Sequence, residues 1–152
     1  MCTSFMGELM TATHNFGTAP TRGTSAADTF KAALYLATAT VDASTTAFSA
    51  TDEVSGSGYT SGGIAVTNAT PPTATNASAT AGVAFFTPSA SLVYTSVTLT
   101  TAFDAVLIYN STQSNKAVSV HTFGSQTITA GTFTLTMPTN NTTDALLRLA
   151  TT

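Results

Sequence analysis

Charged residues are what this sequence has least of. Asp, Glu, Lys and Arg make up 7% of its 152 residues, whereas a typical soluble domain carries roughly 25%. With 4 basic residues, the chain cannot form the positive stripe that follows a nucleic-acid backbone. We therefore expect no nucleic-acid partner.

Cysteine and long apolar runs are scarce as well. The single cysteine, Cys2, excludes an intrachain disulfide and any metal site built from several cysteines. No apolar run approaches the ~20 residues of a membrane-spanning helix, so we expect no membrane partner. Residues 1–8 lack the basic and apolar parts of a signal peptide, and we expect synthesis in a reducing cytosol.

Threonine is the commonest residue, with 35 copies. A folded chain of 15.4 kDa exposes on the order of 7,000 Å², over which 4 basic and 7 acidic residues are spread thinly. A patch of ~800 Å², which is one partner's share of a standard interface, would then hold about one charge. Such a surface is suited to contact with other proteins.

Residues 103–137 predict the middle of an antiparallel sheet. Residues 103–109 are almost all apolar, as in a strand buried on both faces, and residues 110–115 (NSTQSN) favour a turn. A second strand follows at 116–123, with a break at Gly124. Beyond Gly131, residues 132–137 alternate strictly between threonine and an apolar residue, which indicates a strand with one exposed face.

Further strands are expected at residues 28–36, 64–67, 83–86, 92–99 and 144–149, with a long exposed loop at 69–82. The sequence thus predicts an all-β fold: an antiparallel β-sandwich, immunoglobulin-like or jelly-roll-like, with a short N-terminal helix. We expect a single domain spanning residues 1–152, with the helix and a loop at 1–27 and the sandwich at 28–149.

The N-terminal segment carries large apolar side chains on one side of the expected helix, which Ser4 would cap. An isolated short helix is marginal in water, so this face must be buried. It either plugs an open end of the sandwich or docks on another protein. The candidate partner-contact residues are Phe5, Met6, Leu9, Met10 and Phe16.

Residues with chemical potential are few and scattered. For His121 we expect a structural or surface role, and for His14 a cap or turn, because no nucleophile and acid accompany them in a recognisable motif. The pair Asp52 and Glu53 is interpreted as a solvated turn, since no Ca²⁺-binding loop surrounds it. We expect no catalytic residues, no cofactor and no metal.

The four tyrosines leave one alternative open. Their rings could stack on sugars, although we expect them to fill the edge of the core with hydroxyl groups in water. They are Tyr35, Tyr59, Tyr94 and Tyr109.

Three segments together resemble small virion structural proteins of tailed bacteriophages. They are residues 29–35 (TFKAALY) with 45–48 (TTAF) and 53–63 (EVSGSGYTSGG); residues 105–112 (AVLIYNST); and residues 131–138 (GTFTLTMP) with 146–149 (LLRL). β-Rich members of this size are often cement, or decoration, proteins on the outer capsid surface. The resemblance names no catalytic residue.

The resemblance therefore implies a capsid cement protein that binds the major capsid protein and copies of itself, with a trimer as one arrangement. Two alternatives remain: a neck, tail or baseplate component, and a receptor-binding or carbohydrate-binding module of the virion. Each implies a location on a virion assembled in the cytoplasm of a bacterial host.

Overall fold

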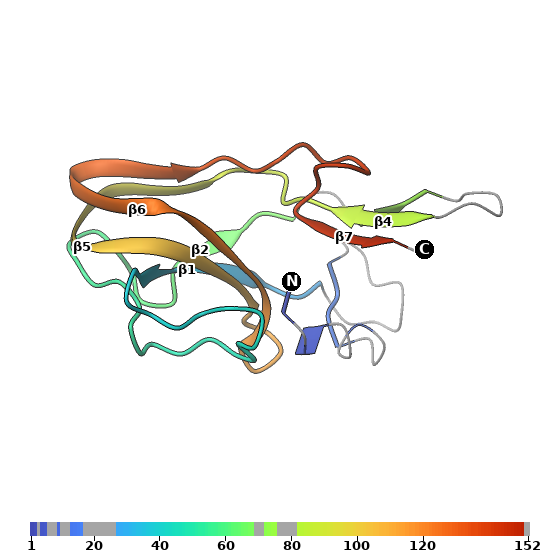
Figure 1. The fold of residues 1–152 in the computed structure, drawn as a ribbon, viewed down its shortest axis with the longest axis horizontal. Coiled ribbons are helices and arrows are strands. Elements are labelled where there is room, and N and C mark those ends of the chain that lie inside the picture. Colours follow the sequence, from blue (N-terminus) through green and yellow to red (C-terminus); the bar gives the residue numbers. More distant parts are fainter. Residues whose placement is uncertain are drawn as a thin grey trace.

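The computed structural model describes residues 1–2, 4–5, 9, 13–16, 27–68, 72–75 and 82–150. Within them the chain is all-β and forms two antiparallel sheets (Figure 1). The strands are β1 (Phe30–Leu36), β2 (Ile64–Val66), β3 (Thr73–Ala74), β4 (Val83–Phe86), β5 (Leu92–Asn110), β6 (Lys116–Leu135) and β7 (Leu147–Ala150).

The larger sheet has the strand order β2-β1-β5-β6. The C-terminal half of β5 lies between β1 and β6, in register with Leu34 opposite Val106 and Leu107 opposite Val120. Leu107 and Ile108 point to opposite faces and are both buried. The prediction of a central strand buried on both faces is therefore confirmed.

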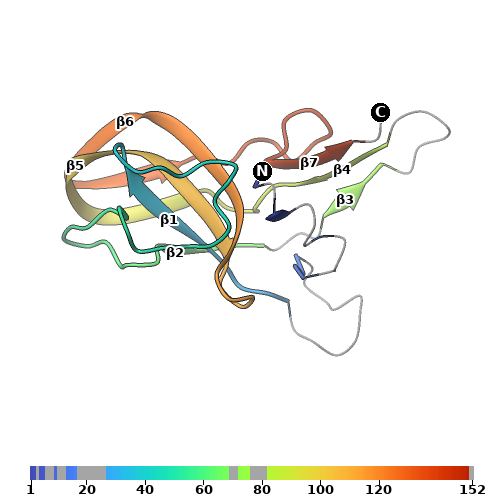
Figure 2. The same cartoon turned by 60° about the horizontal axis from the view of Figure 1, so that its bottom comes forward.

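The hairpin of β5 and β6 is long and folds back over the sheet, as the curled ribbons in Figures 1 and 2 show. Several register shifts interrupt its middle, and Ser96 and Ala130 have positive φ there, so bulges bend the ribbon. As a result Phe103 meets Phe133 edge-to-face at 5.0 Å. The Tyr94 hydroxyl donates a 2.9 Å hydrogen bond to the Ala32 carbonyl of β1.

The smaller sheet has the order β3-β4-β7 and lies at one end of the larger sheet in both views. Aromatic rings join it to the body of the protein. The ring of Phe16 stacks on that of Phe30 in β1 at 4.4 Å and lies 5.1 Å from that of Phe86 in β4. This aromatic cluster closes the end of the core.

Gly63 shows how tightly β2 is applied to β1. Its φ is +71°, and a Cβ atom at this position would lie 1.7 Å from the Ala32 carbonyl oxygen. Only glycine fits there, because any side chain would push the two strands apart.

Three expectations are corrected. The short N-terminal helix is not seen as an element: Ser4, Phe5 and Leu9 have helical backbone, but the residues between them lie outside the described part. The expected strands at 92–99 and 103–109 are one strand, and β6 runs through Gly124 and Gly131. Bulges explain both, since they bend a ribbon without ending its pairing. A short strand, β3, lies within the expected loop 69–82.

Candidate partner-contact surface

The apolar N-terminal residues that the structure describes pack on the protein's own core. Phe5 is 2% exposed and Phe16 is 9% exposed, and their rings meet edge-to-face at 5.9 Å. Leu9 is half-buried. Met6 and Met10 lie outside the described residues. The described members of this set therefore form a plug, whereas docking on another protein stays a prediction.

A buried polar network holds this plug in place. The Asn110 side-chain nitrogen lies 3.1 Å from Nδ1 of His14 and donates a 2.7 Å hydrogen bond to the Asp28 carboxylate. The same carboxylate accepts a 2.9 Å bond from the Asn15 backbone N–H. We expected a cap or turn role for His14, but the structure shows it as a buried link to Asn110 of β5.

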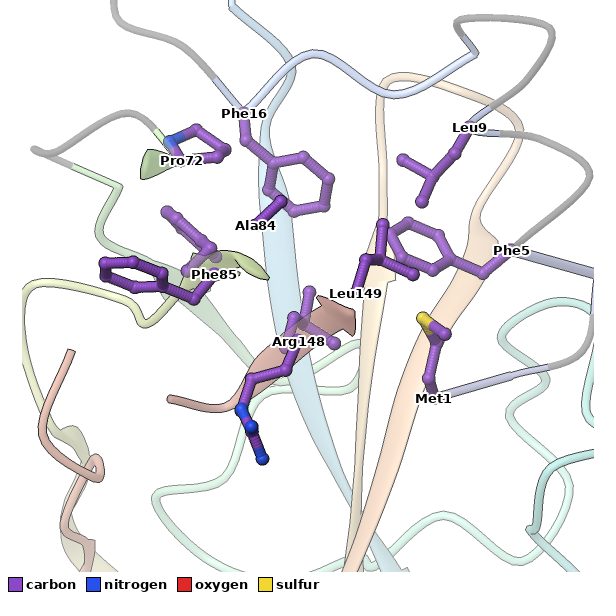
Figure 3. Close-up of a pocket in the computed structure, with 11 residues that line it drawn as sticks. Met1, Phe5, Leu9, Phe16, Pro72, Ala84, Phe85, Arg148 and Leu149 are labelled. Carbon is purple, nitrogen blue, oxygen red and sulfur yellow. The ribbon is translucent and has the colours of Figure 1, made fainter. Parts of the chain in front are cut away.

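A small apolar pocket of about 80 Å³ lies between the plug and the smaller sheet (Figure 3). Two of the exposed large hydrophobic residues line it, Met1 at 40% and Leu149 at 44% exposure. In Figure 3 the Arg148 guanidinium points away from Phe5 and Phe16, so the pocket wall is apolar. Typical ligand pockets have roughly 300–1,000 Å³, so this one is too small for most small molecules.

Glu53 is the centre of the second polar cluster, and our expectation of a solvated turn is wrong for it. It is 9% exposed. Its Oε1 accepts 2.7 Å hydrogen bonds from the Tyr59 hydroxyl and the Gly62 N–H, and its Oε2 accepts one of 2.7 Å from Ser61. Asp52, its neighbour, is exposed. Glu53 therefore closes the loop of residues 53–63 on itself, and the Tyr59 hydroxyl attaches this loop to β1 by accepting the Leu34 N–H at 3.0 Å.

The tyrosines surround this carboxylate with their hydroxyl groups bonded inside the protein, not in water. Tyr59 donates to Glu53, Tyr94 to Ala32 and Tyr109 to the Gly62 carbonyl. Burial, followed by the charge of Glu53, raises the pKa of Tyr109 to about 12. Burial likewise raises the pKa of Tyr59 and Tyr94. Three of the four side chains are only 2% exposed, so the faces of their rings cannot stack on a sugar; they are Tyr35, Tyr94 and Tyr109.

His121 is held in a neutral state by its surroundings. Burial, and then the positive charge of the N-terminus, lowers its pKa to about 4. A ring nitrogen lies 2.9 Å from the Ser119 hydroxyl. Among the described residues no carboxylate is bonded to this ring, so the pair lacks the acid that orients a catalytic histidine. The structural role that we expected fits this geometry.

Within the described part of the chain, no three His, Cys, Asp or Glu side chains gather as a metal site. No helix within these same residues is long and apolar enough to cross a membrane. The polar clusters thus act on the fold: the cluster of His14, Asp28 and Asn110 joins segments that are distant in the sequence, and the Glu53 carboxylate closes a loop of nearby residues.

No family model matches this chain. The curated proteins and the solved structures contain no match to it either.

The most distinctive exposed surface is the outer face of the β5–β6 hairpin. Val93 in β5 is 42% exposed and lies opposite the exposed Thr134 of β6. Thr95 and Thr132 are exposed close by. Residues 54–103 and 117–143 contain no Asp, Glu, Lys or Arg, so the N-terminal half of β5 and most of β6 carry no formal charge. The strict alternation at 132–137 signals this face in the sequence.

Proposed function

We propose that this protein is a structural component of a bacteriophage virion, specifically a cement protein on the outer face of the major capsid protein. The observation that carries the proposal is the uncharged, threonine-rich outer face of the β5–β6 hairpin. A protein that is dispersed in solution usually carries interspersed charge. A protein that is bound to a shell needs complementarity to its neighbours instead.

The energetics of many weak contacts support this role. Apolar burial contributes about 25 cal/mol per Å² before the costs of association are counted. Each copy would add a modest stabilisation, and the repetition of a shell would multiply it. The proposal assigns the protein no catalytic activity and no cofactor, and it places the protein on the capsid surface after assembly in the bacterial cytoplasm.

The finer fold belongs to the same proposal. We infer an immunoglobulin-like or jelly-roll-like β-sandwich in which the two halves of the bent β5–β6 hairpin form facing layers. The ring contact between Phe103 and Phe133 supports this arrangement, because the two residues lie on different halves of the hairpin. Such a sandwich leaves its outer faces available to neighbours.

The alternatives differ in how well the described residues support them. A neck, tail or baseplate component would use the same neutral surface. A carbohydrate-binding module would need an exposed aromatic platform, and three of the four tyrosines are buried. We therefore rank the carbohydrate-binding module last.

Copy number separates the first two roles. On a stained gel of purified particles, a cement protein should approach the molar amount of the major capsid protein. A neck, tail or baseplate component should be far below it. Particles that lack the chain altogether would contradict any virion role.

The mode of attachment is tested by salt. Attachment through apolar and backbone contacts should survive ~1 M NaCl, because screening weakens exposed charge pairs but not apolar burial. Release of the protein from purified capsids at this salt concentration would show that charge pairs dominate the contact.

A further inference from the structure

The outer edge of β6 is the longest unpaired strand edge in the described part of the chain. β6 is the last strand of the order β2-β1-β5-β6 and is 20 residues long. The protein's own chain covers only its beginning. Ala117 donates its N–H to Thr46, and the Val118 carbonyl accepts the N–H of Cys2. From Ser119 to Leu135 no described segment pairs with this edge.

This edge has few of the features that normally prevent strands from pairing with other chains. Lysine, proline and inward-pointing charges usually protect long edges. After Lys116, the strand contains no charged residue and no proline. Its protection is limited to the bulges in the middle of the hairpin, which leave regular stretches at Ser119–Thr122 and Phe133–Leu135.

We propose that a second copy of this chain pairs along this edge, β6 against β6, across a two-fold axis. The inference deepens the proposed function by giving self-association a surface and a symmetry. It rests on that function only for the choice of a second copy as partner.

The unequal lengths of the two sheet edges decide the arrangement. The opposite edge is β2, which has three residues, Ile64–Val66. A head-to-tail contact between β6 and β2 would therefore pair few residues. Pairing β6 with β6 matches two long edges and closes after two copies, as an isologous contact does. The symmetry then differs from the trimer that we considered from the sequence.

The composition of the edge agrees with pairing between identical strands. Like charges opposite one another destabilise cross-strand pairs, and this strand brings none beyond Lys116. Exposed threonines, among them Thr122, Thr132 and Thr134, would face each other, and threonine pairs are favourable in sheets. Main-chain hydrogen bonds would supply affinity, as they do in strand addition generally.

The test adds one charge to each regular stretch of this edge. Thr122→Lys and Thr134→Lys, measured separately by sedimentation equilibrium of the purified chain, should each weaken dimerisation by about tenfold, because a lysine on a strand edge opposes pairing with another strand. The matched control is Thr67→Lys, an exposed position beside the opposite edge. It should leave dimerisation unchanged.

A mixture provides the rescue. Thr122→Lys mixed with Thr122→Glu should form a heterodimer more tightly than either variant pairs with itself. Circular dichroism and thermal melting of each variant establish that the fold is kept. A wild-type chain that stays monomeric, equal weakening by the Thr67 control, or a trimer would overturn the proposal. None of these results depends on virions, so failure of the capsid role would be seen separately.

Discussion

Replacing Glu53 by alanine should lower the free energy of unfolding by about 3–5 kcal/mol, the usual result of breaking a buried charge cluster. Its carboxylate accepts three hydrogen bonds of 2.7 Å, from Tyr59, Ser61 and Gly62. Hydrogen bonds to a charged group contribute about 1.5–3 kcal/mol each, and removal of the costly buried charge offsets part of their sum. Alanine leaves the Tyr59 and Gly62 donors without this acceptor, whereas the hydroxyl of the exposed Ser61 can bond water.

Two further variants isolate the cause. Glu53→Gln keeps one acceptor oxygen but replaces the other with an NH2 donor and removes the charge, so it should lose about 1–2 kcal/mol. Asp52→Asn removes a charge from the exposed neighbour, whose positive φ asparagine tolerates, and should change stability by less than ~0.5 kcal/mol. Urea unfolding followed by circular dichroism measures all three. A loss below ~1 kcal/mol for Glu53→Ala would refute the role of this cluster.

Three other outcomes are expected. The folded state favours the neutral form of Tyr109, whose pKa is raised to about 12. The stability gained from keeping Tyr109 neutral is complete below the unfolded pKa of about 10, and it is lost as the pH rises through the folded pKa. Tyrosinate absorbance should accordingly appear late in an alkaline titration, and an ordinary titration would contradict the burial. Leu107→Ala and Ile108→Ala should each lose about 2–5 kcal/mol in urea unfolding, and a loss below ~1 kcal/mol at either would place β5 outside the core. Phe16→Ala should lose about 3–5 kcal/mol and lower the melting temperature; an unchanged melting temperature would argue against the plug.

Local patterns were sufficient to predict the centre of the sheet. The apolar run that contains Leu107 and Ile108 can be buried on both faces only in a central strand, and residues 110–115 have the composition of a turn. Both features depend on neighbours in the sequence. The structure places the strand and the turn accordingly, with β5 ending at Asn110 and β6 beginning at Lys116.

The continuity of the long strands could not be predicted in the same way. Gly124 and Gly131 usually mark the ends of strands, but here they lie within β6. The bulged middle of the hairpin accommodates them, because a bulge bends the strand while pairing resumes on its other side. A single sequence does not distinguish a bend from a break.

The buried polar clusters depend on contacts between distant residues. His14 and Asn110 are 96 positions apart, and Asp28 and Asn110 are 82 apart. No spacing motif signals such a contact, so His14 was expected at a turn. Glu53 differs in one respect: the partners of its carboxylate are close in sequence, and only its burial comes from the folding of residues 53–63 onto the distant strand β1. The local pattern therefore indicated solvent exposure.

The proposed place on the capsid is tested most directly by a three-dimensional reconstruction of the purified particle. We expect density for this fold on the outer surface of the head, repeated with the lattice of the major capsid protein and with its uncharged β5–β6 surface in contact with protein. Density confined to the neck or tail, or a head without it, would contradict the cement role.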